Sequence, residues 1–98
     1  MYASIRRYEG SGKVDEIARL VKEDLLPIIR KVPGFVAYYG IDARYGVAVT
    51  ITIFEDRGAA VVAHKLAEKW VEENLASNFI KSPEVISGEV VVFEDVVN

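Results

Sequence analysis

The sequence contains no cysteine, so disulfide bridges and thiolate chemistry are excluded. It has a single histidine, His64, and its carboxylates are scattered along the chain. Because metal ions are held by clusters of imidazole, thiolate and carboxylate groups, we expect no metal site. A glycine-rich phosphate loop is also missing, and no serine or cysteine nucleophile stands in a recognisable arrangement. These absences argue against metal-dependent, phosphate-binding and covalent nucleophilic chemistry.

Long apolar runs are missing as well. No stretch approaches the roughly 18 apolar residues that a membrane span requires. Arg6, Arg7 and Glu9 interrupt any early run that could resemble a signal peptide. We therefore expect no membrane association and a cytoplasmic location, which the lack of cysteine fits. The net charge of −3 is diffuse, which argues against nucleic acid as a partner.

What the sequence does contain is a high share of apolar residues, 51% of 98. A chain of this length is expected to form one domain over residues 1–98. A domain of that size buries about 60–70% of the surface that its unfolded chain exposes. We therefore expect part of the apolar material to be buried against a partner.

The order of the hydrophobic patterns predicts the fold. Period-two segments predict strands and segments with apolar residues three or four apart predict helices. The expected order is strand Ser4–Tyr8, helix Val14–Val32, strands Phe35–Asp42 and Val47–Glu55, helix Ala59–Leu75 and strand Glu89–Phe93. Pro27 lies inside the first helical pattern and predicts a kink near Glu23–Leu26. This order is typical of an α+β ferredoxin-like βαββαβ sandwich with an antiparallel sheet.

The segment from Val47 to Phe54 has two uncharged faces. Alternation places Val47, Val49, Ile51 and Ile53 on one face and Ala48, Thr50, Thr52 and Phe54 on the other. One face has to meet the helices. We expect the other, with its small, β-branched and aromatic side chains, to be covered by the sheet of a second copy in a homodimer. The alternative is that a threonine-rich face is exposed to water.

Two segments resemble the antibiotic-biosynthesis-monooxygenase-like family. They are residues Leu26–Phe35, with the sequence LPIIRKVPGF, and Phe54-Glu55-Asp56 followed by an alanine-rich helix. The resemblance implies a dimeric α/β barrel in which two sheets pack face to face, with the first and third strands central. It also implies that some relatives are cofactor-free oxygenases acting on quinol-like or polyketide aromatic substrates, and that some degrade haem.

The resemblance bears on His64. Relatives often carry a histidine on the second helix, and here the matching position is Ala63. We favour an ordinary histidine at the border of the apolar helix face, and the alternative is a base or hydrogen-bond donor at the mouth of a cleft. Haem-degrading relatives place a tryptophan before the histidine, whereas Trp70 follows His64, and residues 3–5 include no asparagine. The resemblance therefore disfavours haem, and we expect no cofactor.

Four residues are candidates for contact with a ligand: Arg6, Tyr39, His64 and Trp70. We expect Trp70 to be a core anchor, the alternative being a stacking wall for a flat ligand. Tyr39 is expected to face the helices, and Tyr38 the partner sheet or the rim. Arg6 and Arg7 point to opposite faces. One is expected in an interface or salt bridge and the other at an anionic ligand group, but alternation does not say which.

Two classes of function stay open. The chain is either a cofactor-independent monooxygenase for a quinol-like or polyketide aromatic small molecule, or a non-catalytic domain for small-molecule binding or dimerisation. The first needs an apolar pocket with a few polar groups. An open cavity between the helices and the sheet would separate ligand-binding functions from a dimerisation module with a filled core.

Overall fold

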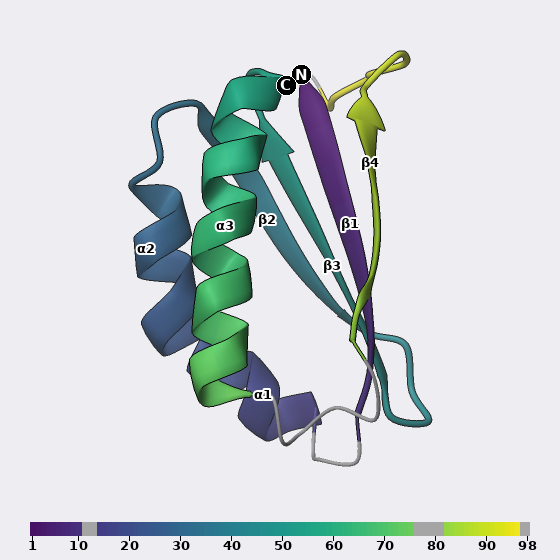
Figure 1. The fold of residues 1–98 in the computed structure, drawn as a ribbon. Helices are drawn as coiled ribbons and strands as arrows, with labels where there is room; N and C mark the ends of the chain where they lie inside the picture. Colours follow the sequence, from purple (N-terminus) through teal and green to yellow (C-terminus); the bar gives the residue numbers. More distant parts are fainter. Residues whose placement is uncertain (11–13, 76–81, 97–98) are drawn as a thin grey trace.

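The computed structural model describes residues 1–10, 14–75 and 82–96. It contains strands β1 (Tyr2–Glu9), β2 (Phe35–Asp42), β3 (Val47–Phe54) and β4 (Glu84–Glu89), and helices α1 (Val14–Leu20), η1 (Val21–Leu25), α2 (Leu26–Arg30) and α3 (Arg57–Asn74). The strands form one antiparallel sheet, and the helices lie against one of its faces (Figure 1). The predicted α+β ferredoxin-like fold is therefore confirmed.

The sheet has the strand order β2-β3-β1-β4. The first and third strands are therefore central, as the family resemblance implies. Strand β1 pairs with both neighbours in one register, so Ile5 lies opposite Ile51 on β3 and opposite Ile86 on β4. This pairing fixes which side chains share a face, because directly opposed residues point to the same side of a sheet.

The first helical segment is interrupted immediately before Pro27. Residues Val21–Leu25 form a π-helical turn between the α-helical segments Val14–Leu20 and Leu26–Arg30. Proline has no N–H to donate and crowds the preceding turn, so a widened turn accommodates it. The sequence predicts a kink near Glu23–Leu26, and the π-helical turn lies in the same part of the helix.

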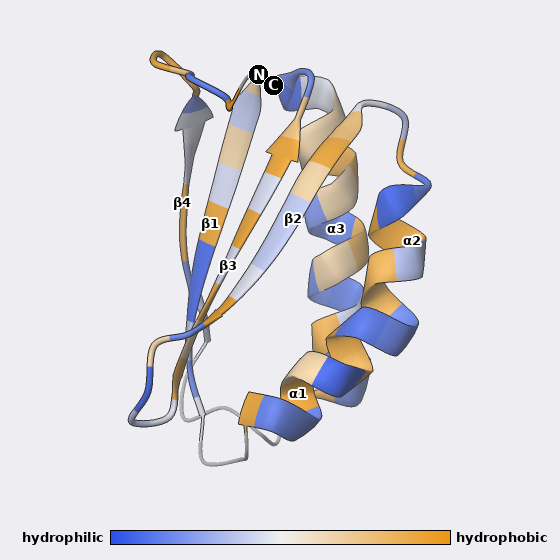
Figure 2. Cartoon of the chain, turned by 180° about the vertical axis from the view of Figure 1, so that it is seen from behind, coloured by the Kyte–Doolittle hydropathy of each residue, from blue (hydrophilic) through white to orange (hydrophobic). Residues whose placement is uncertain are grey.

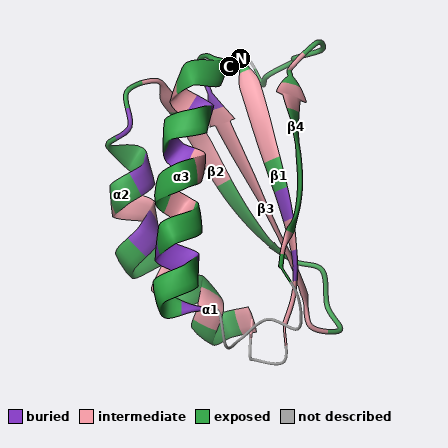
Figure 3. Ribbon diagram, viewed as in Figure 1, coloured by how far each residue is buried: buried purple, intermediate pink, exposed green. Residues whose placement is uncertain are grey.

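Helix α3 begins with a side-chain cap and presents a narrow apolar face to the sheet. Asp56 accepts a hydrogen bond of 2.9 Å from the backbone N–H of Ala59. This contact satisfies one of the free donors of the first turn. The buried residues of the chain line the space between helices and sheet (Figure 3). The hydrophobic core consists of Tyr8, Leu25, Ile29, Val32, Phe54, Ala60, Ala63, Trp70, Val71 and Leu75.

The last strand differs from its predicted position. The sequence pattern predicts it at Glu89–Phe93, but β4 spans Glu84–Glu89. Beyond it, one backbone hydrogen bond of 2.9 Å joins the Val90 N–H to the Met1 carbonyl, and Val91, Val92 and Phe93 are then largely exposed. The prediction followed the apolar run at the end of the chain. The strand that actually pairs is at the edge of the sheet, where charged residues and glycine are tolerated because one side of the strand is free.

Most side chains of β2 also point to the opposite side of the sheet from the one predicted. Phe35 pairs with Phe54 but Ala37 pairs with Ile53, so Val36 is an extra residue, a β-bulge. The bulge shifts the alternation by one position. Phe35 still packs on the core, 6.1 Å from the ring centroid of Phe54, but beyond the bulge it is Tyr38 that faces the helices.

The two faces of β3 are likewise exchanged relative to our expectation. Thr50, Thr52 and Phe54 face the helices, where they line a cavity. The expectation that the threonine face meets a second sheet is therefore wrong. The open face instead carries an apolar row that crosses all four strands. Figure 2 shows the chain from behind, with hydrophobic stretches on the central strands β1 and β3. Register places in this row Tyr39, Ile51, Ile5 and Ile86.

Candidate functional site

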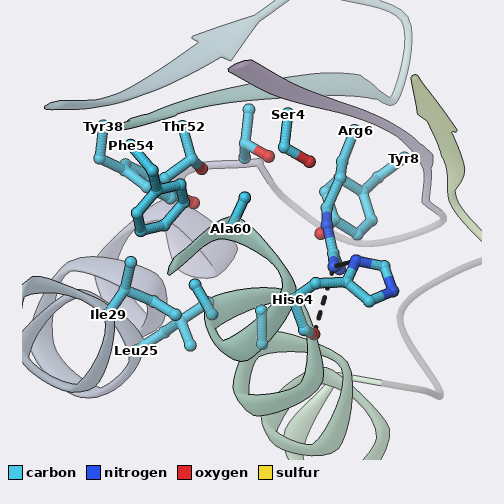
Figure 4. Close-up of a pocket in the computed structure, with 13 residues that line it drawn as sticks. Ser4, Arg6, Tyr8, Leu25, Ile29, Tyr38, Thr52, Phe54, Ala60 and His64 are labelled. Atoms are coloured by element: carbon cyan, nitrogen blue, oxygen red, sulfur yellow. Dashed lines mark hydrogen bonds between the residues drawn. The ribbon is translucent and has the colours of Figure 1, made fainter. Parts of the chain in front are cut away.

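A small cavity lies between the central strands and α3. Its volume is about 30 Å³, which is room for one or two water-sized groups. The strands contribute mainly polar side chains to its lining, and the helices contribute mainly apolar side chains together with His64 (Figure 4). The lining residues include Ser4, Arg6, Tyr8, Tyr38, Thr50 and Thr52 from the strands and Leu25, Ile29, Ala60, Ala63, His64 and Ala67 from the helices.

Arg6 crosses from the sheet to α3 at one side of this cavity. Its side chain is 7% exposed, and its Nη2 donates a hydrogen bond to Nδ1 of His64. The same nitrogen lies 3.4 Å from the backbone carbonyl oxygen of His64. Figure 4 shows the guanidinium reaching toward the imidazole. Strand β1 and helix α3 are therefore joined at the site by a polar contact as well as by apolar packing.

The partners of His64 determine which ring nitrogen carries a hydrogen. A guanidinium only donates, so Nδ1 has to accept. The other ring nitrogen, Nε2, lies 3.2 Å from Oε2 of Glu68, one helical turn along α3. The imidazole is thus fixed between a donor and an acceptor. Its lone pair is directed at Arg6 and is not available to an incoming ligand.

Arg6 has no carboxylate partner among the described residues, although it is buried. The adjacent Arg7 lies on the other face and contacts Glu9 at 2.5 Å and Glu84 at 3.8 Å. A guanidinium carries five N–H donors, and His64 engages only Nη2. Within the described residues no side-chain nitrogen or oxygen is sealed from solvent without a partner. The other N–H groups of Arg6 therefore open onto the cavity.

Tyr38 stands at the opposite side of the same cavity. Burial raises the pKa of Tyr38 to about 12, and the neighbouring Tyr8 acts in the same direction. A hydrogen bond with Thr50 and the positive charge of Arg6 act against that shift. The phenol is therefore neutral at physiological pH and offers a hydroxyl group that can donate or accept.

A larger, mostly apolar cavity adjoins the first beneath α1. Its volume is about 230 Å³, and it shares Tyr8, Leu25, Tyr38 and Thr50 with the small cavity. The rest of its lining is largely aliphatic, with Val14, Ile17, Val21, Val49, Val71 and Leu75 among the contributors. Gly40 leaves open space where a side chain would project. The polar group at Arg6 and an apolar chamber therefore lie side by side.

The structure brings together two of the four predicted candidates, Arg6 and His64. Tyr39 is 58% exposed on the open face of the sheet, so the prediction that it faces the helices is wrong, and Tyr38 occupies that place. Trp70 is 8% exposed and belongs to the hydrophobic core. Sequence reasoning did not identify Thr50 as part of the site. Its place opposite Arg6 in the register would have indicated it.

Within residues 1–10, 14–75 and 82–96, no group of three or more His, Cys, Asp or Glu side chains could hold a metal ion. No helix in the described ranges is long and apolar enough to cross a membrane.

No family model and no curated protein sequence matches the chain. Solved structures do. SnoaB, a cofactor-independent oxygenase from Streptomyces nogalater, has a TM-score of 0.77 at 16% identity, with 94% of each chain covered. A putative antibiotic biosynthesis monooxygenase from Nitrosomonas europaea has a TM-score of 0.71 at 13% identity, covering 94% of this chain and 100% of that one. This chain has the antibiotic biosynthesis monooxygenase fold.

The same fold is found in a haem-degrading protein. MhuD from Mycobacterium tuberculosis, solved with two haems bound in its active site, has a TM-score of 0.73 at 16% identity, covering 97% of this chain and 100% of that one. The antibiotic biosynthesis monooxygenase fold thus serves proteins with different ligands. The function of this chain has to be argued from its own cavity.

Proposed function

We propose that this chain is a cofactor-independent monooxygenase that acts, as a homodimer, on a small quinol-like or polyketide aromatic molecule. The observation that carries the proposal is the buried guanidinium of Arg6, which opens onto a cavity beside an apolar chamber. An aromatic ring fits the chamber, and a ring oxygen fits the polar end. The likeness in fold to a cofactor-independent oxygenase agrees with this arrangement.

The chemistry needs no external reductant. An ionised phenol or quinol is rich in electrons and can reduce dioxygen itself. When a ring CH₂ group is converted to a ketone, one oxygen atom of O₂ becomes the carbonyl oxygen and the other leaves as water with both hydrogens. The four electrons come from the substrate carbon. Arg6 would stabilise the negative charge on the phenolate oxygen, and preorganised donors of this kind are worth about 10²–10³ in rate.

Haem does not fit this site. Both ring nitrogens of His64 are engaged, Nδ1 by Arg6 and Nε2 by Glu68, so His64 presents no lone pair to an iron atom. The apolar chamber of about 230 Å³ also lies below the roughly 300 Å³ at which pockets for drug-sized ligands begin, so its ligand has to be compact. A compact aromatic ligand suits these dimensions better than a tetrapyrrole.

The homodimer is proposed from the open face of the sheet. Ile5, Tyr39 and Ile86 are 37%, 58% and 69% exposed there, in one row with Ile51. Antiparallel sheets that face water on one side normally carry polar residues there. A second copy packed face to face would cover this row and leave both cavities on the outer, helix-covered sides. We place the dimer in the cytoplasm, in keeping with the absence of cysteine.

One observation favours a second function, ligand binding without turnover. The cavity residues Ser4, Thr50, Thr52 and Tyr38 are neutral hydroxyls, and the lone pair of His64 faces Arg6. No described side chain in the small cavity is therefore a free general base. A monooxygenase of this design has to receive its substrate already ionised or lose the phenol proton to water.

Oxygen consumption distinguishes the two functions. Purified protein is treated with a chelator and stirred with a panel of anthrones, naphthoquinols and simple phenols in an oxygen-electrode cell. The proposal predicts uptake of one O₂ per ketone formed, in proportion to protein. Tight binding of a panel member without oxygen uptake would instead establish the binding function.

A further inference from the structure

A third cavity opens between α3 and the edge strand β4. It is a groove of about 220 Å³, and two exposed cations, Arg57 and Lys65, stand at its rim. Neither forms an ion pair with a described carboxylate, and the lining includes no aspartate or glutamate. The lining is completed by Tyr2, Ser4, Ala60, Val61, His64, Val85 and Ser87.

The groove adjoins the small cavity that Arg6 lines. It shares Ser4, Ala60 and His64 with the small cavity, so those three residues form the boundary between them. The small cavity in turn shares four residues with the apolar chamber. Groove, polar cavity and apolar chamber therefore follow one another across the inner face of the sheet, with the guanidinium of Arg6 in the middle.

We propose that the ligand of this site is a small aromatic anion, whose charged oxygen is bound by Arg6 and which reaches the site through the cationic groove. This rests on the proposed function only in using the same pocket, and it specifies the ligand's charge and its orientation. The ring lies in the apolar chamber and the anionic oxygen in the small cavity. A phenolate and a carboxylate share the required chemistry.

The charge distribution carries this inference. The chain as a whole has a net charge of −3, which would repel an anion, and two carboxylates, Asp15 and Asp42, line the apolar chamber. The charged side chains that line the groove and the small cavity are Arg57, Lys65 and Arg6, so the part of the route where the anionic oxygen would lie is cationic. Burying a charge is costly unless it is compensated, and Arg6 has only a neutral imidazole and a carbonyl as partners. An anionic oxygen at its free N–H groups would supply the missing countercharge in a charge-assisted hydrogen bond.

Isothermal titration calorimetry with two matched probes tests the inference. 2-Naphthoate is an anion at neutral pH, and 2-naphthylmethanol is a neutral molecule of similar shape. We expect naphthoate to bind roughly 10-fold to 100-fold more tightly, as hydrogen bonds between charged groups allow. Equal affinities, or no binding of naphthoate at millimolar concentration, would overturn the inference.

Neighbouring residues provide the control variants. Arg6→Met should abolish the preference for naphthoate, whereas Arg7→Met, which removes the same charge from the other face of β1, should retain it. A similar loss in both variants would contradict the assignment. To distinguish the two anion sources, 2-naphthol is titrated across its ionisation. If affinity rises when 2-naphthol ionises and Arg6→Met removes that rise, the ligand is a phenolate. If affinity does not rise, the ligand is a carboxylate.

A second pair of variants tests the route if Arg6→Met fails to fold. Lys65→Met should weaken naphthoate binding and reduce its salt dependence, whereas Lys69→Met, on the same helix but outside the groove, should change neither. An unaltered affinity in Lys65→Met would refute the cationic route. Anion binding without oxygen uptake would refute the monooxygenase and leave this inference standing. Oxygen uptake with no preference for anions would refute this inference and leave the monooxygenase standing.

Discussion

Arg6 on β1 donates a hydrogen bond to Nδ1 of His64 on α3, across 58 positions of the chain. This contact makes the imidazole a positioning group for the guanidinium. Glu68 holds the other side of the ring and so fixes its orientation. The donor that faces the cavity is therefore Arg6, and His64 acts through it.

The two residues should differ in their contribution to activity. Arg6→Met should lower kcat/KM for an anthrone substrate by about 100-fold or more, as loss of a preorganised donor does. His64→Ala should lower it by less than about 10-fold, because a general acid or base would contribute about 10²–10⁴-fold. Steady-state oxygen uptake measures both. A larger loss in His64→Ala than in Arg6→Met, with folding intact, would make His64 the catalytic group.

Tyr38 should make stability fall at alkaline pH. Its pKa is raised from 10.0 to about 12 in the folded state, so folding favours the protonated phenol. That contribution is complete below pH 10 and is lost as the pH rises to about 12. The free energy of unfolding of Tyr38→Phe should therefore fall less over this range.

Tyr45→Phe is the matched control for this measurement, because Tyr45 is 98% exposed. Urea unfolding at several alkaline pH values gives the slope of the free energy of unfolding against pH for each variant. Tyr45→Phe should follow the wild type. An identical pH dependence in Tyr38→Phe and the wild type would show that Tyr38 titrates normally.

Trp70→Ala should destabilise the fold by about 3–5 kcal/mol, as removal of a large side chain from a packed core does. The side chain is 8% exposed and belongs to the core cluster. Urea unfolding followed by far-ultraviolet circular dichroism measures the loss, with Leu66→Ala, 39% exposed on the same helix, as the milder comparison. An unchanged midpoint for Trp70→Ala would mean that the indole is not a core anchor.

Ile51→Lys should dissociate the proposed homodimer. Ile51 stands between Tyr39 and Ile5 on the open sheet face, and a lysine there would be buried without a partner in the interface. Sedimentation velocity at micromolar concentration should show a dimer for the wild type and for Val62→Lys, a substitution at a 52% exposed helix position. A monomeric wild type would refute the dimer.

The sequence predicted the order of elements correctly because the patterns of both helices and of the first three strands are strongly periodic. It did not predict which side chains of β2 face the helices. The extra residue Val36 shifts the alternation, and nothing in the period-two pattern marks it. The last strand was misplaced because Val90–Phe93 is more apolar than the strand that pairs with β1, Glu84–Glu89. Local pattern cannot identify an edge strand that is largely polar.

The candidate site was predictable only in part. Alternation separates Arg6 from Arg7, but only the carboxylates Glu9 and Glu84 on the other face decide that Arg7 is the paired one. The border position of His64 on its helix follows from the helical period. Its contact with Arg6 depends on how the helix lies over the sheet, and no spacing along the chain encodes that.

The central claim is that Arg6 serves a cavity in which an aromatic substrate reduces dioxygen without a cofactor. The most direct measurement is oxygen uptake by chelator-treated protein with an anthrone, compared between the wild type, Arg6→Met and Arg7→Met. We predict that one O₂ is consumed per ketone formed in the wild type and in Arg7→Met, and that uptake in Arg6→Met is lower by about 100-fold. Equal rates in Arg6→Met and the wild type, or no uptake above the protein-free rate, would contradict it.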